Sequence, residues 1–318
     1  MRTLIAILVV LLTFGATFAQ GEGQVDETRT TLRLELLRLV NRDRVAHGLK
    51  PVELDFEASI IADEYCSKQL REKTNGHFTT DGRSPYMRYS AAGGNDGVSE
   101  NTAAWSAPFD FTPRALLDMT RRSQQAMMEE LPPDDGHRKT ILDPHATHVG
   151  IGMAWEKGEF RLAQEFVRRY VSWSRPLPRR AGASDLVRGA GKPLPGTKIE
   201  AISVHYEPAP HPMPVHVANA ISHYSLPLKR KDYLPLLRGI FRRREDGTLH
   251  VIRNEYRDGR RGDFHVAEDG SFSFGVPFTE GPGVYTVVVW VRNQGEEAPV
   301  AASNISIEVS GQTWSGTR

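Results

Sequence analysis

Two kinds of hydrophobic pattern divide the chain. In three stretches between residues 31 and 131, apolar side chains recur every three or four positions, which is the period of helices with one buried face. Beyond residue 198 they alternate with polar residues or form β-branched runs, which is typical of strands. The pattern therefore predicts a mixed helical and strand domain followed by an all-strand domain.

Three longer helices are predicted in the first part. One covers residues 31–44 and ends at Gly48, a residue common just beyond helix ends. A second begins after Asp55, whose side chain is a good N-cap. A third begins at Thr112 and Pro113, an N-cap residue followed by the favoured first helical residue. These signals place the helix boundaries.

The segments between and after these helices are shorter. Residues 74–97 are polar and rich in glycine, which predicts a long loop with one helical turn, and residues 135–141 predict a short turn. Residues 149–155 and 160–167 alternate around a glycine and predict an antiparallel hairpin. We therefore assign this part to the α+β class.

The second part begins after a change in composition. Residues 175–196 are rich in Pro, Gly, Ala and Arg and have no apolar period, which predicts a linker between domains. Turn clusters separate the strands expected beyond it, which are residues 198–205, 249–256, 271–276, 284–291 and 302–309. Short strands at such spacing predict an immunoglobulin-like β-sandwich.

The first residues predict export. Arg2 precedes the apolar run 4–12, and the small residues Ala16 and Ala19 follow it, as in a signal peptide over residues 1–19. The run is short for a bilayer, and no later stretch approaches the ~18 apolar residues of a membrane helix. We expect a secreted protein, extracellular or periplasmic, with no transmembrane segment in the mature chain.

Composition narrows the choice of partners. Forty basic and thirty-nine acidic residues nearly cancel, so no global charge favours nucleic acid as a partner. The single cysteine, Cys66, cannot form an internal disulfide. Its neighbours follow a helical apolar pattern, so we expect a buried thiol that acts as a small hydrophobic side chain.

Candidate chemistry rests on two histidines and a glutamate that each lie beside a turn. His77 follows Gly76, Glu100 lies between a serine and an asparagine, and His137 follows Gly136. Imidazole and carboxylate together can bind a divalent cation such as zinc or exchange protons near neutral pH. The residues match no short-range zinc motif, so either role needs the fold to bring them together.

Five segments in this order resemble one family. They are Leu39-Val40-Asn41-Arg42-Asp43-Arg44, Gly76-His77-Phe78, Ser99-Glu100-Asn101, the run Gly136-His137-Arg138-Lys139-Thr140-Ile141-Leu142, and Thr147-His148-Val149-Gly150-Ile151-Gly152. Together they are similar to the bacterial branch of the CAP superfamily, named for cysteine-rich secretory, antigen 5 and pathogenesis-related proteins and also called SCP-like. The resemblance spans residues 31–171 and implies a three-layer α/β/α sandwich.

The resemblance also implies a site. In that family two histidines and two acidic residues face a shared cleft, and the matching positions are His77, Glu100 and His137. The fourth is Glu129 or Glu130. At ~100° per residue Glu130 flanks the apolar face of its helix and Glu129 points away, so we expect Glu130. A metal, zinc or another divalent cation, would then be held by His77, His137 and Glu100, with Glu130 as a further candidate.

The expected domains are the signal peptide 1–19, a CAP domain over 28–173, the linker 174–196 and a β-sandwich over 197–310. Three functions remain open. The first is a secreted binding module for a metal and a small-molecule, lipid, glycan or peptide ligand, attached through the β-sandwich. The second is a metal-dependent hydrolase of peptides or esters, and the third an adhesive exoprotein with a vestigial cleft. No serine or cysteine nucleophile has a recognisable setting, which favours binding over catalysis.

Overall fold

The structure, a computed structural model, describes residues 26–252 and 254–311. The predicted signal peptide lies outside the described residues. These residues form two units: a first unit of residues 26–73, 101–144 and 149–164, and a second unit of residues 74–100, 145–148 and 165–311. No helix in the described ranges combines the length and apolarity needed to cross a membrane.

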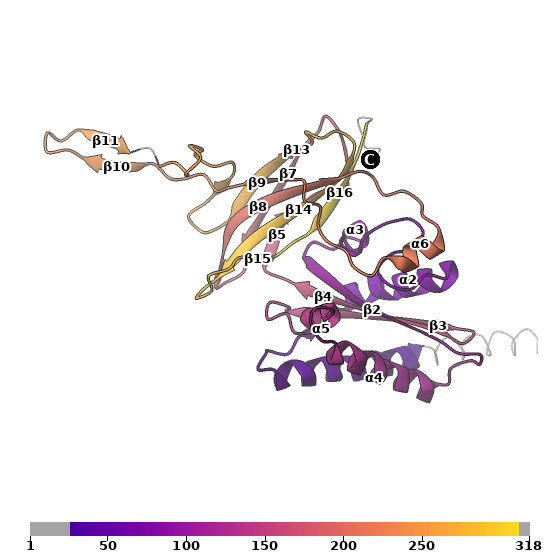
Figure 1. Cartoon of the computed structure of the whole chain (residues 1–318). Coiled ribbons are helices and arrows are strands. Elements are labelled where there is room, and N and C mark those ends of the chain that lie inside the picture. The colour runs from indigo at the N-terminus through magenta and orange to yellow at the C-terminus, as the bar shows by residue number, and fades with distance from the viewer. Residues whose placement is uncertain (1–25, 253, 312–318) are drawn as a thin grey trace, which may run out of the picture. The chain divides into compact units, whose positions relative to one another are not determined.

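The first unit has helices on both faces of a sheet. The sheet has the order β1-β3-β4-β2. Its elements are a helix over residues 26–46, β1 (Glu53–Leu54), α2 (Phe56–Glu72), β2 (Gly97–Ser106), α4 (Pro113–Glu129), α5 (Gly136–Ile141), β3 (His148–Glu156) and β4 (Glu159–Arg168). Figure 1 shows α2 on one face of the sheet and α4 on the other. This part of the chain is therefore α+β with three layers.

The predicted helix starts are confirmed. Asp55 accepts a hydrogen bond from the backbone N–H of Ala58 at 2.9 Å, and α2 begins directly after it. Thr112 does the same for the N–H of Ala115 at 3.2 Å, ahead of α4. Each side chain satisfies one backbone donor that the helix itself leaves unpaired.

Two glycines let α2 approach the sheet closely. A Cβ added to Gly152 would lie 2.1 Å from the backbone carbon of Ala62, and one added to Gly150 would lie 2.5 Å from that of Ala58. Cys66 lies in the same contact and is fully buried, so the prediction of a buried thiol is confirmed.

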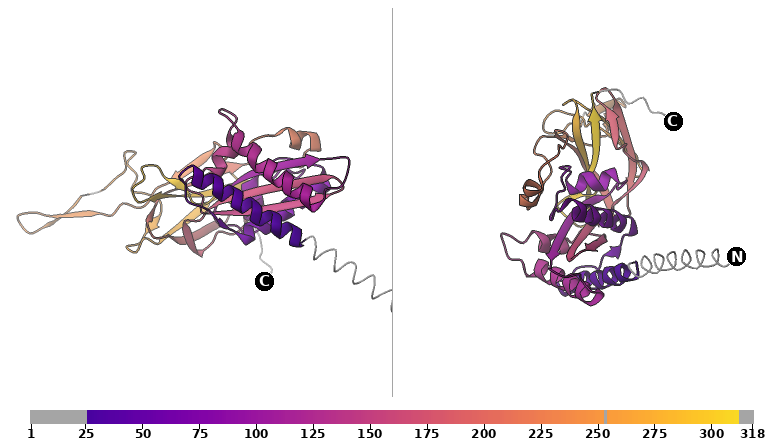
Figure 2. Two further views of the ribbon diagram at one scale, coloured as in Figure 1. Left: turned by 90° about the horizontal axis from the view of Figure 1, so that it is seen from below. Right: turned by 90° about the vertical axis from the view of Figure 1, so that its right-hand side faces the viewer.

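The other face carries two helices side by side, the helix over 26–46 and α4 (Figure 2). Arg121 on α4 bonds Glu35 at 2.8 Å, and Gln124 on α4 bonds Asp43 at 2.8 Å. The predicted helix over 31–44 thus lies within a described helix that pairs with α4 through polar contacts at its rim.

The second unit has two larger sheets around one core, with the strand orders β12-β13-β7-β5 and β6-β16-β14-β8-β9, and a separate two-stranded sheet of β10 and β11. Strand β15 pairs with β14. Its helices are α3 (Pro85–Ala91) and α6 (Val215–Ala220). Its strands are β5 (Val171–Arg175), β6 (Arg180–Gly182), β7 (Leu186–Pro193), β8 (Thr197–Glu207), β9 (Arg230–Tyr233), β10 (Ile240–Arg243), β11 (Leu249–Ile252), β12 (His265–Val266), β13 (Phe272–Pro277), β14 (Gly283–Asn293), β15 (Val300–Ala301) and β16 (Ile305–Ser310).

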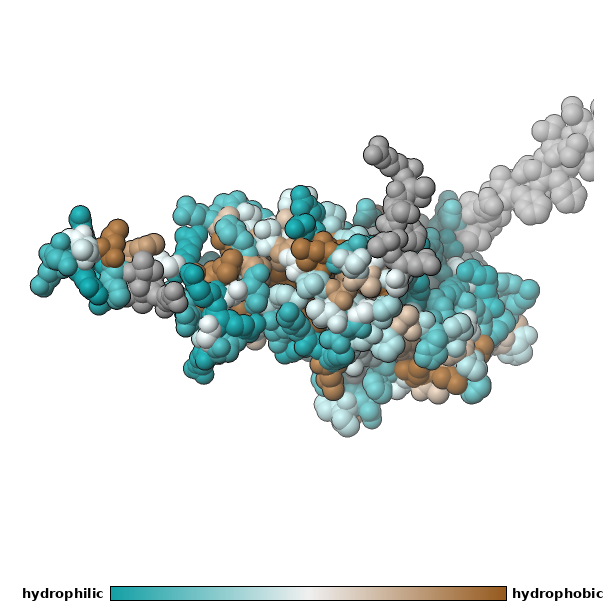
Figure 3. Space-filling model, turned by 90° about the horizontal axis from the view of Figure 1, so that it is seen from above, coloured by the Kyte–Doolittle hydropathy of each residue, from teal (hydrophilic) through white to brown (hydrophobic). Residues whose placement is uncertain are grey.

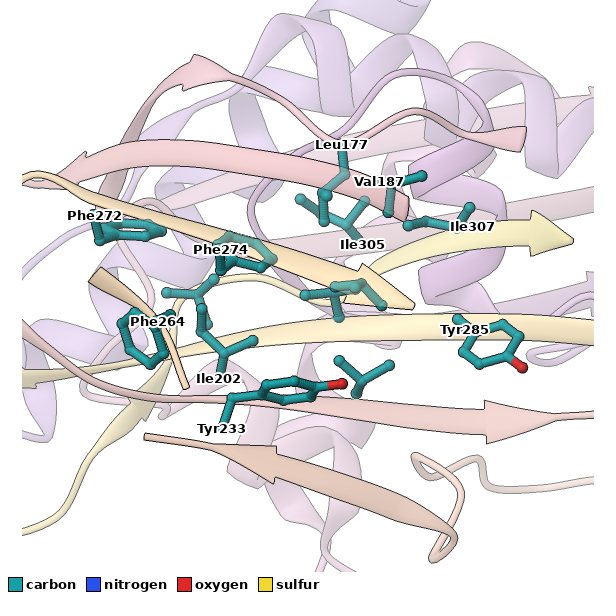
Figure 4. Close-up of a cluster of buried hydrophobic side chains, with 14 of the residues drawn as sticks. Leu177, Val187, Ile202, Tyr233, Phe264, Phe272, Phe274, Tyr285, Ile305 and Ile307 are labelled. Atoms are coloured by element: carbon teal, nitrogen blue, oxygen red, sulfur yellow. The ribbon is translucent and has the colours of Figure 1, made fainter. Parts of the chain in front are cut away.

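The core of this unit lies between the two sheets. Figure 4 shows Phe272 and Phe274 from one sheet facing Ile202, Tyr285 and Ile305 from the other. All five side chains are buried. Burial of such large apolar surfaces is the main favourable term that holds the sheets together.

The linker predicted over residues 174–196 is wrong, because β6 and β7 lie inside it. Strand β7 pairs with β5 on one side and β13 on the other. Strand β7 lacks an alternating apolar pattern because larger side chains would not fit there. A Cβ added to Gly189 would lie 2.6 Å from the ring of Phe274. The small residues of this strand leave room for rings from β13.

The structure also differs from a CAP domain that ends at residue 173, because residues 74–100 belong to the second unit. The side chain of Asn304 donates to the carbonyl of Val98 at 2.9 Å and accepts from its N–H at 3.2 Å. The N–H of Gly97 donates to the carbonyl of Ala302 at 2.9 Å. The last strands of the chain thus hold the start of β2.

Candidate functional site

The predicted site residues form two histidine–glutamate pairs. In the second unit, Nδ1 of His77 lies 2.9 Å from Oε1 of Glu100. In the first unit, Nδ1 of His137 is hydrogen-bonded to Oε1 of Glu130. In both pairs the carboxylate contacts the same ring nitrogen.

An arginine joins the first pair. Arg88 on α3 donates to the other oxygen of Glu100 at 2.5 Å and to the backbone carbonyl of His77 at 2.8 Å. His77 and Glu100 are only 6% and 3% exposed. Both carboxylate oxygens of Glu100 are therefore occupied by protein donors in a buried setting.

A second buried carboxyl lies beside Glu100. Burial acts to raise the pKa of Glu100, but the charge of Arg88 and the bond from His77 hold it below its ordinary value. Burial, followed by the charge of Glu100, raises the pKa of Glu165 well above its ordinary value. Glu165 on β4 is 2% exposed, and its Oε2 has no hydrogen-bond partner among the described residues. The surroundings thus shift the pKa values of the two carboxyls in opposite directions, down for Glu100 and up for Glu165.

Tyr224 comes from the connection between β8 and β9. Its hydroxyl accepts the backbone N–H of Glu100 at 2.6 Å. Its ring stands edge-on to the ring of His77, with the centroids 4.9 Å apart. Burial raises the pKa of Tyr224, so the hydroxyl stays neutral. A residue from the later half of the chain therefore contacts both members of the first pair.

This contact contributes to the burial of the first pair. The resemblance implied that His77 and Glu100 face a shared cleft, and in the structure both side chains are buried. Tyr224 packs on the ring of one and the backbone of the other.

The second pair is more exposed and also caps a helix. Oε2 of Glu130 accepts the backbone N–H of His137 at 2.9 Å and that of Arg138 at 3.3 Å, at the start of α5. The side chains of His137 and Glu130 are 32% and 22% exposed. Glu129 is exposed and bonds Gln125 instead. Of the two candidates, Glu130 is the one that contacts His137.

A series of hydrogen-bonded side-chain amides leads from the backbone of His137 into the first unit. Asn101 on β2 donates to the carbonyl of His137 at 3.1 Å and to Gln164 on β4 at 3.2 Å. Gln164 donates to Gln124 on α4 at 2.8 Å, and Gln124 donates to Asp43. These bonds tie the loop of the second pair to the sheet and to both helices of one layer.

The donor set limits how a cation could be held. The glutamates already accept bonds from protein groups, so they fit as partners that orient the histidines rather than as direct ligands. Because Nδ1 of each ring faces a carboxylate, Nε2 is the ring atom that would take the metal. Throughout the described ranges, no three His, Cys, Asp or Glu side chains are grouped as a metal site.

Sequence reasoning missed Arg88, Glu165 and Tyr224. A glutamate within the apolar run of β4 is a signal, because strands buried on both faces seldom carry a carboxyl. Arg88 lies in a segment expected to be mostly loop. No local pattern marks Tyr224, since it reaches the site only through the strand pairing of the second unit.

Comparison with known proteins gives a family for part of the chain. Residues 37–166 match the model described as the cysteine-rich secretory protein family, CAP. An extracellular protein containing an SCP domain from Bacillus anthracis str. Ames is 18% identical, with a TM-score of 0.31, over 44% of this chain and 41% of that one. The chain thus spans less than half of that protein's length. No curated protein matches.

Proposed function

We propose that the chain, whose residues 37–166 match the CAP family model, is a secreted binding protein whose histidine–glutamate pairs take up a divalent cation. Zinc suits this role, because it accepts neutral imidazole and keeps positions for a further ligand. That ligand would be a small molecule, lipid, glycan or peptide. The imidazoles of His77 and His137 would be the ligands, each oriented by its own glutamate, Glu100 or Glu130.

One observation carries the proposal: in both pairs the carboxylate engages Nδ1 of the histidine. A carboxylate on one ring nitrogen fixes the tautomer and orientation of the ring and makes the other nitrogen a better ligand. A bound cation would supply a positive charge that polarises a carboxylate, phosphate or carbonyl of the ligand.

Calorimetric titration with zinc tests the proposal. The wild type should bind zinc at pH 7.5, and His77→Ala combined with His137→Ala should abolish stoichiometric binding. His265→Ala, which removes an exposed histidine of β12, is the matched control and should bind normally. Binding should weaken at acidic pH, because protons compete with the metal for the imidazole nitrogen.

Two results would contradict the proposal. Equal zinc affinity in the wild type and the double variant would remove these histidines from the site. Absence of binding by the wild type would favour the adhesive exoprotein with a vestigial site.

Glu165 favours a second candidate, a hydrolase of peptides or esters. Its raised pKa makes it a buried proton donor beside Glu100. Arg88 and His77 occupy Glu100, so Glu165 would be the acid in such a reaction. Hydrolysis of generic peptide or ester substrates that Glu165→Gln abolishes would establish this activity.

We assign the two-sheet part of the second unit, proposed as immunoglobulin-like, to attachment. The hairpin of β10 and β11 supports this, because Phe241 and Leu249 are 64% and 66% exposed beside Arg242, Arg243 and Arg244. Figure 3 shows this hairpin with apolar and polar side chains together. Replacing the three arginines with glutamate should abolish retention on an immobilised polyanion, and unchanged retention would contradict the assignment.

A further inference from the structure

The connection between β8 and β9, residues 208–229, is unusually long for its place in the fold. The two strands are antiparallel neighbours that pair from Ile202↔Tyr233 to His205↔Arg230. Such neighbours are ordinarily joined by two to five residues, and connections beyond about 12 residues are usually functional.

The first half of the connection is stiff. Pro208, Pro210, Pro212 and Pro214 alternate with other residues before α6 begins. Proline has no N–H to donate to a sheet and fixes its own backbone angle, so this stretch cannot extend β8. It leads away from the sheet as a strap.

The connection meets the residues around His77. The N–H of Met213 donates to the carbonyl of Thr80 at 2.8 Å, and the N–H of Asn75 donates to the side chain of Asn219 at 2.8 Å. A Cβ added to Gly82 would lie 2.6 Å from the carbonyl oxygen of His211, so the backbones touch there too.

Tyr224 gives the connection its contact with the site. It lies on the ring of His77 and accepts the N–H of Glu100. Farther along, the carbonyl of Ser225 accepts a bond from Tyr86 at 3.4 Å. The connection thus lies over both members of the first pair.

Few apolar side chains anchor the connection. Of the residues of α6, only Ala218 is buried, and His211, His216 and His223 are exposed. Segments with little apolar burial open at a free-energy cost well below that of global unfolding.

We propose that residues 208–228 form a lid over His77, that Tyr224 is the lid's residue in the site, and that the lid must lift before a cation or other reagent reaches His77. The part of this inference that concerns the cation rests on the proposed function. The part that concerns access to His77 does not. On this proposal the second unit controls access to His77 through the lid, in addition to attaching the protein.

A disulfide that holds the lid down tests this directly. Thr80→Cys with Met213→Cys, in a Cys66→Ala background, places two thiols where the backbones are already hydrogen-bonded. The rate at which diethyl pyrocarbonate modifies His77 is then followed by peptide mass spectrometry. Oxidation should slow the modification of His77 at least tenfold, and reduction should restore it.

His137 provides the internal control, because it belongs to the other unit and its side chain is 32% exposed. Its modification rate should not change on oxidation. In the same assay Tyr224→Ala should speed the modification of His77 several-fold, whereas Leu228→Ala, at a 99% exposed residue, should leave it unchanged.

The outcomes separate the two proposals. If oxidation slows modification of His77 but the wild type binds no zinc, the lid stands and the cation proposal fails. If the oxidised and reduced proteins react at equal rates, the lid is overturned whatever zinc does. If Tyr224→Ala does not fold, the disulfide comparison decides alone, since both states are the same protein.

Discussion

At the scale of single residues, Glu100 and Glu130 each pair with a histidine, but their surroundings differ. Each bonds Nδ1 of a histidine, but Glu100 is buried with Arg88, whereas Glu130 is partly exposed and caps α5. Removing one member of a buried ion pair leaves the other charge without compensation, which costs far more than losing an exposed pair.

We therefore expect Glu100→Gln to lower the free energy of unfolding by about 3 kcal/mol, because Arg88 loses its buried counter-charge. Glu130→Gln, the matched change in the exposed pair, should cost about 1 kcal/mol or less. Urea unfolding followed by circular dichroism measures both. Similar losses in the two variants would show that burial does not distinguish the pairs.

Glu165 predicts a pH dependence of stability. Its raised pKa means that, above about pH 4.5, the folded protein holds a proton that the unfolded chain has released. Its contribution to stability is complete below that pH and is lost as the pH rises to the native pKa. Glu165→Gln holds no titrating proton, so its free energy of unfolding should fall less between pH 5 and 8. Parallel curves for wild type and variant would contradict the raised pKa.

The limits of sequence reasoning are clear at this scale. His77, Glu100 and His137 could be found because each lies in a short motif. Helix geometry also selected Glu130 over Glu129, but α4 ends at Glu129, and Glu130 is the non-helical residue that follows it. Tyr224 could not be found, since its contact with His77 depends on pairing between strands far from it in sequence.

At the scale of elements, the glycines of β3 set the distance between α2 and the sheet. Gly152→Ala would place a Cβ 2.1 Å from the backbone of α2. Because backbone atoms must move, we expect a loss of about 2 to 3 kcal/mol in unfolding free energy. Gly136→Ala, where nothing lies within 4 Å, is the control and should change stability by about 1 kcal/mol or less. Differential scanning calorimetry measures the melting temperatures of both variants. Equal melting temperatures for Gly152→Ala and Gly136→Ala would contradict the close contact.

The elements that sequence predicted best are those with local signals. N-caps at Asp55 and Thr112 mark helix starts, and alternation marks the hairpin of β3 and β4. Strand β7 was predicted as part of a linker, because Gly189 and its small neighbours carry no apolar pattern. Their packing under aromatic rings is a tertiary effect that no local window contains.

At the scale of the whole molecule, the chain is interleaved rather than divided at one point. Residues 74–100 belong to the same unit as residues 165–311, through bonds such as those of Asn304 with Val98. The resemblance located the CAP segments along the chain, but it could not show that some of them pack with later strands.

A fragment of residues 26–173 therefore should not reproduce the native state of residues 74–100. Without Asn304 and Tyr224, the backbone N–H groups of Val98 and Glu100 lose their acceptors. Hydrogen exchange should show protection of these amides in the full chain and its loss in the fragment, while α2 and α4 remain protected. Equal protection at Val98 in both proteins would restore an independent domain ending at residue 173.

The central claim is that a glutamate on Nδ1 orients each histidine to bind a cation through Nε2, and nitrogen NMR of the imidazole rings tests it most directly. At pH 8, His77 and His137 should both show the tautomer with the proton on Nδ1, and zinc should shift the Nε2 resonance of each ring. A proton on Nε2 in either ring, or Nε2 resonances that zinc leaves unmoved, would contradict the account.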